Sequence, residues 1–327
     1  MIKTNLNRYK NSIKVWPYLD DLSQAIIPYS DEHLSKNKNT AVNLDFSCIR
    51  RISSAGASIT LFKLISLLVN KGYILRIVMP ENQSVENYLQ DSGFLYLLDK
   101  TLNINKVDLF DSISINNHAK PYITSNKGVK KTSFPIYYLK HDKDDRRKSV
   151  EEFADWITDI LYDNLSDYSI KKNVLASVLT EIAKNTQDHT EGDACFGIDI
   201  IESTQAKSGE IIFSCSDLGI GISSNIRNHL KENPSNLRES AYKHFSYTDS
   251  YKYAFTVGNT TSKDSKNKGI GMSMILDGVN LLDIDLTIWD GRSMLLVPDL
   301  ITHSELRRKA FNTSLAVGFY YYGRLNF

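Results

Sequence analysis

The chain has 327 residues, which is long enough for two domains that each bury a core. Its 42% hydrophobic and 24% charged content is typical of an ordinary soluble globular protein. Lys and Arg total 39 against 38 for Asp and Glu, so no overall basic field indicates nucleic acid or anionic lipid as a partner.

The three cysteines, Cys48, Cys195 and Cys215, stand in apolar runs without CxxC spacing. This spacing argues against a zinc site or a disulfide framework, and we expect reduced, buried packing residues. No stretch approaches the roughly 20 apolar residues that a membrane span needs. We therefore expect a cytoplasmic protein without a membrane segment.

From Ala41 onward, strand and helix patterns alternate. AVNLDFS predicts a strand, ISSAGASITLFKLISLLVNKGY a turn and an amphipathic helix, and ILRIVMP a second strand. A short helix follows and ends at Gly93, before the apolar stretch FLYLLDKTLNI. This alternation predicts an α/β domain over residues 1–110, with helices packed on one side of a sheet.

The segment LDFSCIRRISSAGASITLFKLI, residues 44–65, resembles the STAS domain of anti-sigma-factor antagonists. The resemblance implies that Ser54 holds the position that is phosphorylated in phosphoregulated members, although Ser53 stands where an aspartate is usual. A phosphate at a helix start would meet free backbone N–H groups and the positive end of the helix dipole. The alternative is that Ser53 or Ser54 is simply the N-cap.

Residues 111–147 are polar and irregular, with Pro135 and the charged run HDKDDRRK, and we interpret them as an inter-domain linker. Within this span, FPIYYLK is apolar enough to form a strand of the following domain. The segment 149–164, SVEEFADWITDILYDN, begins with a capping-box pattern and carries apolar residues at helical spacing, which predicts a helix.

The segment 177–190, SVLTEIAKNTQDHT, predicts a helix on which Glu181, Asn185 and His189 share one face. An apolar stripe that includes Val178 and Ile182 lies beside that face. An acid, an amide and an imidazole next to a core-facing stripe form a candidate site; the alternative is an ordinary solvated face.

Two glycine-rich stretches follow. CFGIDII and EIIFSC predict paired strands, and SCSDLGIGI closes the second of them with Asp217, Gly219 and Gly221. After a long polar insertion, NKGIGMSMI places Gly269 and Gly271 at the start of a further helix. DIDLTIWDG, SMLLVPD and LAVGFYYYGRLNF then predict three closing strands.

In this order, the three stretches resemble the N-box (ExxxNxxxH), G1 box (DxGxG) and G2 box (GxG) of the GHKL ATPase superfamily. That superfamily includes gyrase B, MutL, sensor histidine kinases and anti-sigma serine kinases. The resemblance implies a two-layer α/β (α+β) architecture over residues 148–327, namely a Bergerat-type sandwich with a mixed sheet and a mobile ATP lid. It also implies ATP and Mg²⁺ as cofactors.

The resemblance assigns a role to each motif residue. Glu181 would be the catalytic base, and Asn185 would hold Mg²⁺ through its amide oxygen. Asp217 would accept a hydrogen bond from the adenine amino group. The remaining nucleotide contacts would come from Gly219, Gly221, Lys268, Gly269 and Gly271.

What ATP accomplishes stays open at this point. We expect a regulatory switch driven by ATP binding and slow hydrolysis, with a protein partner bound through the STAS-like domain or the lid. The alternatives are a serine/threonine kinase acting on Ser54 or on a partner, and a non-catalytic ATP-bound scaffold. His141 lacks the sequence context of a phosphoacceptor, which argues against a sensor histidine kinase. A homodimer is compatible with the family resemblance.

Overall fold

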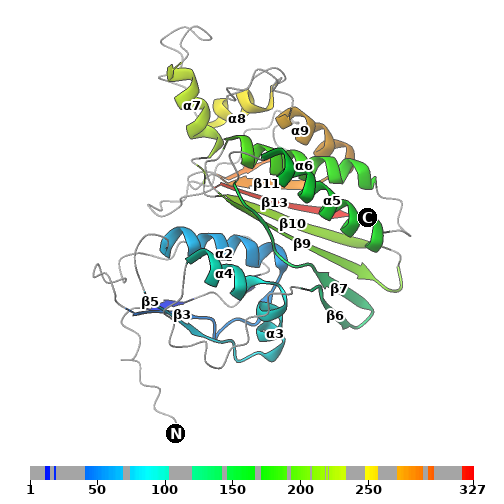
Figure 1. The fold of residues 1–327 in the computed structure, drawn as a ribbon. Helices are drawn as coiled ribbons and strands as arrows, with labels where there is room; N and C mark the ends of the chain where they lie inside the picture. The colour runs from blue at the N-terminus through cyan, green and yellow to red at the C-terminus, as the bar shows by residue number, and fades with distance from the viewer. Residues whose placement is uncertain are drawn as a thin grey trace.

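A large sheet dominates the computed structural model, with helices on both of its faces (Figure 1). The structure describes residues 12–14, 18–19, 41–68, 74–102, 120–141, 146–165, 171–189, 193–206, 208–217, 219, 221–232, 247–256, 271–289, 294–297 and 319–327. The part that is described is therefore a mixed α/β protein, as the sequence predicts.

The large sheet has eight strands in the order β12-β11-β13-β10-β9-β7-β6, with β8 also paired to β9. The strands are β6 (Tyr122–Asn126), β7 (Val129–Ser133), β8 (Tyr137–Leu139), β9 (Ala194–Ser203), β10 (Gly209–Asp217), β11 (Asp285–Trp289), β12 (Met294–Leu296) and β13 (Phe319–Asn326). Every described pairing in it is antiparallel, which corrects the predicted mixed sheet. One reason is that a pair of helices, not a single helix, connects β8 to β9, so that the chain returns to the end of the sheet at which β8 left it and β9 runs antiparallel to β8.

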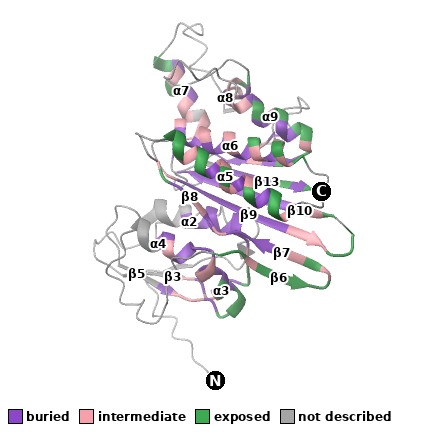
Figure 2. Cartoon of the chain, turned by 45° about the vertical axis from the view of Figure 1, so that its right-hand side comes forward, coloured by how far each residue is buried: buried purple, intermediate pink, exposed green. Residues whose placement is uncertain are grey.

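Three helices cover one face of this sheet: α5 (Arg146–Asn164), α6 (Lys172–His189) and α9 (Gly271–Leu282) (Figure 1). Alternate residues of β9 and β10, including Phe196, Ile198, Phe213 and Cys215, belong to the hydrophobic core beneath these helices. Figure 2 shows the resulting band of buried residues along the central strands. The predicted helices and strands of this region are confirmed.

The opposite face is covered by helix α2 (Ser54–Leu68), which belongs to the N-terminal part of the chain (Figure 1). Residues 53–61 are all buried. The predicted amphipathic helix is therefore a buried helix over its first two turns. The physical reason lies in the sequence, because residues 54–61 are only small, hydroxyl-bearing or apolar and offer no charged face to solvent.

The N-terminal part forms a smaller parallel sheet of β1 (Ser12–Lys14), β3 (Ala41–Asp45) and β5 (Ile74–Val78). A two-stranded ladder joins β2 (Tyr18–Leu19) to β4 (Arg51–Ile52). Helices α3 (Gln83–Asp91) and α4 (Phe94–Leu102) follow β5. Gly93, with φ of 79°, separates them, so the predicted strand, helix, strand order and the helix stop are confirmed.

Much of the predicted linker 111–147 is structured. Residues 122–133 form the hairpin β6–β7, and β8 comes directly after it. The hairpin turns at Lys127 and Gly128, whose φ values are 49° and 82°, as a two-residue turn between antiparallel strands requires. The large sheet therefore begins before residue 148, because these three strands pair with each other and with β9.

Two short helices follow β10: α7 (Ile222–Glu232) and α8 (Tyr247–Phe255). Tyr251 and Phe255 of α8 are buried in the hydrophobic core. None of the described helices is long and apolar enough to cross a membrane. Cys195 and Cys215 are buried free thiols, as expected, and Cys48 is a partly exposed one.

Candidate functional site

Helix α6 brings two of the predicted site residues against the start of α9. A β-carbon at Gly271 would lie 2.8 Å from Oε2 of Glu181 and 3.4 Å from Oδ1 of Asn185. The first approach is closer than real β-carbons tolerate, so only glycine fits there without a shift of the Glu181 side chain. The fold thus places together residues that are about 90 positions apart in the sequence.

A methionine and a tyrosine extend this cluster toward the sheet. The Asn185 amide donates to Sδ of Met272 at 3.3 Å, and the Tyr321 hydroxyl donates to the same sulfur at 3.8 Å. Burial raises the pKa of Tyr321, and the neighbouring Cys215 and Asp217 raise it further. Tyr321 therefore lies between the polar face of α6 and the end of β10.

Asp217 is the last residue of β10 and is almost fully buried, at 1% exposure. Its Oδ1 accepts a hydrogen bond of 2.7 Å from the Gly219 amide. Burial raises the pKa of Asp217 to about 7, and the hydrogen bond from Gly219 partly opposes this effect. A buried carboxyl with this pKa gains most from a ligand that donates a further hydrogen bond to it.

The predicted base, Glu181, is accompanied by a cation. Nζ of Lys184 lies 3.5 Å from both carboxylate oxygens of Glu181. The Glu181 side chain is 15% exposed and that of Lys184 is 43% exposed. This single ion pair leaves lone pairs on both carboxylate oxygens, so Glu181 can still accept hydrogen bonds from a water molecule or a ligand.

The remaining motif residues are only partly described. Gly219 is buried, and Gly221 has φ of 81° at the start of α7, where its carbonyl accepts the Asn225 amide. This left-handed conformation explains a glycine at position 221. Lys268, Gly269 and the side chain of His189 lie outside the described residues.

Ser54 is remote from this cluster, on the other face of the sheet. Its side chain is fully buried, and its hydroxyl donates to the Phe134 carbonyl at 2.6 Å. Ser53 is the N-cap of α2, since its Oγ accepts the Gly56 amide at 2.9 Å. Phosphorylation of Ser54 stays a prediction, and it would require α2 to move, because the hydroxyl has no exposed surface in this arrangement.

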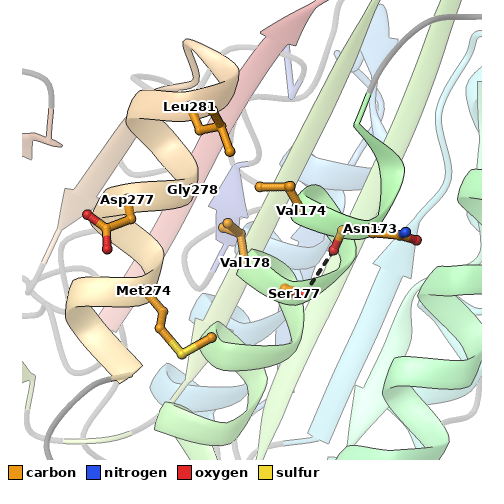
Figure 3. A pocket seen from close by; sticks show the side chains of 8 residues that line it. All are labelled: Asn173, Val174, Ser177, Val178, Met274, Asp277, Gly278 and Leu281. Carbon is orange, nitrogen blue, oxygen red and sulfur yellow. Dashed lines mark hydrogen bonds between the residues drawn. The ribbon is translucent and has the colours of Figure 1, made fainter.

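A groove of about 310 Å³ runs between α6 and α9 (Figure 3). It is lined by Asn173, Val174, Ser177, Val178, Met274, Asp277, Gly278 and Leu281. None of the predicted site residues lines it, although it follows the same two helices. Gly278 sets the spacing of these helices, because a β-carbon there would lie 2.2 Å from Cγ2 of Val178.

Two residues of the candidate site, Met272 and Tyr321, were not predicted. Tyr321 lies in the closing strand and pairs in register with Cys215 and Ile288. Its alternation with Gly323 and Leu325 in FYYYGRLNF indicates a core-facing position. Met272 directly follows the second G-x-G, but nothing in that motif indicates a contact with Asn185.

The donor set fits a magnesium ion that takes most of its ligands from phosphate and water. Within the described ranges, no group of three or more His, Cys, Asp or Glu side chains could hold a metal ion. Asn185 offers one neutral oxygen, which suits an ion that binds few protein ligands. No model of a known protein family matches the chain, and no curated protein sequence is significantly similar to it.

Proposed function

We propose that the chain binds ATP with Mg²⁺ between α6, the start of α9 and the end of β10, and that it works as a regulatory switch with slow hydrolysis. The observation that carries the proposal is that Gly271 lies so close to Glu181 and Asn185 that a β-carbon there would meet both side chains. The backbone amides of a helix start, next to an acid and an amide side chain, are suited to a polyphosphate and its metal ion.

Each group then has one task. Asp217 accepts a hydrogen bond from the adenine amino group, and Gly219 and Gly221 let the backbone pass close to the nucleotide. The first amides of α9, together with Lys268 and Gly269, bind the phosphates. Asn185 would hold a magnesium ion, which would neutralise charge on the phosphates. Glu181 orients a water molecule for attack on the γ-phosphate and accepts its proton.

Nucleotide binding tests the proposal directly. In isothermal titration with MgATP, we expect Asn185→Ala to weaken binding by about tenfold or more, as expected for loss of a charge-assisted contact. Asn173→Ala is the matched control, because Asn173 is an exposed amide near the other end of α6. Equal affinities for the two variants, or no ATP binding by the unchanged protein, would contradict the proposal.

The fate of the γ-phosphate separates the switch from its alternatives. We expect γ-labelled ATP to yield free phosphate, with Glu181→Gln slowing the release by about 100-fold or more. Label on the chain that disappears with Ser54→Ala would instead indicate a serine kinase acting on the chain itself. Label transferred to an added partner would indicate a kinase with an external substrate. ATP binding with neither product would favour a scaffold.

A further inference from the structure

The N-terminus of α2 is held by a carboxylate from a distant strand. Asp199 of β9 accepts the Ser54 amide on Oδ1 at 3.0 Å and the Ala55 amide on Oδ2 at 3.1 Å. Ser53 satisfies the next amide, that of Gly56, and the Ala57 amide bonds the Ser53 carbonyl. The amides of Ser54, Ala55 and Gly56, which have no carbonyl partner one turn earlier in the helix, are therefore all occupied, and the Ala57 bond is the first regular bond of the helix.

Asp199 is fully buried, yet several donors surround it. Besides the two helix amides, the Ser133 hydroxyl donates to its Oδ1. Nζ of Lys131 lies 3.7 Å from the same oxygen and donates to the Ile52 carbonyl at 3.3 Å. The Lys131 side chain is 24% exposed, so the cation that balances Asp199 reaches solvent.

Further contacts between the first turns of α2 and the sheet are polar or involve the backbone. The Ser58 and Ser214 hydroxyls lie 2.6 Å apart, and Ser214 donates to the Ala55 carbonyl at 2.8 Å. A β-carbon at Gly197 would lie 2.1 Å from the Ser54 carbonyl oxygen, so the helix backbone rests directly on β9. Most of these bonds have an equivalent partner in water.

We propose that α2 is a releasable helix, docked on the back of the large sheet by Asp199 and able to leave it while the sheet and its other helices stay folded. The polar groups that part on opening, namely helix-start amides, hydroxyls and a carboxylate, are groups that water can satisfy. Two buried hydroxyls on these elements, those of Thr60 on α2 and Ser216 on β10, have no hydrogen-bond partner in the described part of the chain. Water reaching them on opening offsets part of the bonds that are lost.

The protein contains a matched pair of reporters for this motion. Cys195 and Cys215 are fully buried on neighbouring strands, and burial raises the pKa of both thiols. Strand alternation puts Cys195 on the side of Gly197 and Asp199, beneath α2, whereas Cys215 belongs to the apolar core on the opposite face. Release of α2 uncovers Cys195 alone, while unfolding of the whole protein uncovers both.

The test is thiol labelling followed by mass spectrometry, in the full chain with Cys48→Ala to remove the partly exposed thiol. We expect Cys195 to react about tenfold or more faster than Cys215 under native conditions. Asp199→Asn should raise the Cys195 rate by about 10- to 100-fold and leave the Cys215 rate unchanged. Gly197→Ala should do the same by pushing the helix away without altering a charge.

Glu202→Gln is the control, since Glu202 lies on the same strand and pairs with Lys130, away from α2; both cysteines should keep their rates. Equal labelling rates for Cys195 and Cys215 in the Cys48→Ala protein, without a further substitution, would overturn the proposal, because α2 would then open only when the protein unfolds. An equal rise at both cysteines in Asp199→Asn and in Gly197→Ala would overturn it as well. If Asp199→Asn does not fold, the rates measured in Gly197→Ala and in the Cys48→Ala protein alone still show whether α2 opens by itself.

Discussion

The two faces of the large sheet are built by different chemistry. Beneath α5, α6 and α9, the strands present aromatic and aliphatic side chains such as Phe196 and Phe213 to an apolar core. Beneath α2, the same strands present Asp199 and Ser214, which meet the helix through hydrogen bonds, and Gly197, which lets the helix backbone approach closely. Apolar burial is lost in full when a contact opens, whereas hydrogen bonds are exchanged for bonds to water. The first face is therefore suited to holding the fold together and the second to changing state.

Each face also carries one buried aspartate on a central strand, and the two aspartates differ in how many hydrogen-bond donors surround them. Asp199 has two helix amides, a hydroxyl and a lysine around it. Asp217 has the single amide of Gly219, and its pKa is raised to about 7. A fully satisfied carboxylate is a structural contact, while an under-satisfied one at a strand end is suited to receiving a ligand.

The largest effect is expected from the apolar face. Phe213→Ala should lower the free energy of unfolding by about 3–5 kcal/mol, because the ring is 2% exposed and packs against the backbone at Gly323. Urea unfolding followed by circular dichroism measures the change. A loss below about 1 kcal/mol would mean that the core tolerates a cavity there. The conclusion that the apolar face holds the fold together would then be wrong.

Much of this apolar face could be predicted from the sequence. The helices and central strands were predicted correctly from the helical spacing in 149–164 and 177–190 and from the apolar runs around Cys195 and Phe213. Residues that face a large core recur with the period of the helix or strand that carries them, so the pattern is visible in the sequence. The hairpin β6–β7 was missed because its half-exposed strands are polar. The signal that could have found it is Asn126, Lys127 and Gly128 between two alternating stretches.

The α2 face could not be predicted in the same way. The contact of Asp199 with Ser54 spans 145 positions, and no local pattern encodes such a pairing. One signal was present, since an aspartate inside the apolar run CFGIDII must find donors when it is buried. In the candidate site, the motif residues Glu181, Asn185 and Gly271 were predicted, while the link through Met272 depends on how α9 packs.

Asp217 should make stability depend on pH. Its carboxyl has a pKa of about 7 in the folded chain against an ordinary value of 3.8, so the folded state binds more protons than the unfolded state between these values. The free energy of unfolding should therefore fall as pH rises through this window and level off above it, by up to about 1.4 kcal/mol per pH unit. Asp217→Asn should remove this fall. The free energy of unfolding of the variant should therefore increase relative to that of the unsubstituted protein as pH rises. A difference between the two proteins that stays constant with pH would contradict the assignment.

A smaller effect is expected where α6 and α9 touch. Gly278→Ala should lower the free energy of unfolding by about 1–3 kcal/mol, because its β-carbon would overlap Cγ2 of Val178. In a Val178→Ala background the overlap disappears, and the same substitution should stabilise by up to about 1 kcal/mol through helix propensity. Urea unfolding of the four proteins of this cycle gives both values. The same sign in both backgrounds would show that Gly278 does not set the helix spacing.

The smallest effect should come from Ser214→Ala, the direct neighbour of Phe213 on the other face of β10. The substitution removes the hydroxyl bonds to Ser58 and to the Ala55 carbonyl, and we expect a loss of about 1 kcal/mol in the free energy of unfolding. The loss stays small because the Ser58 hydroxyl, which loses Ser214 as a partner, can donate instead to the Ala55 carbonyl 3.0 Å away. Its signature should be local, as hydrogen exchange should quicken at the amides of Ser54 and Ala55 and not along α6. If Ser214→Ala costs as much as Phe213→Ala, the α2 face is as essential to the fold as the apolar face, and a helix bound that firmly could not serve as a releasable one.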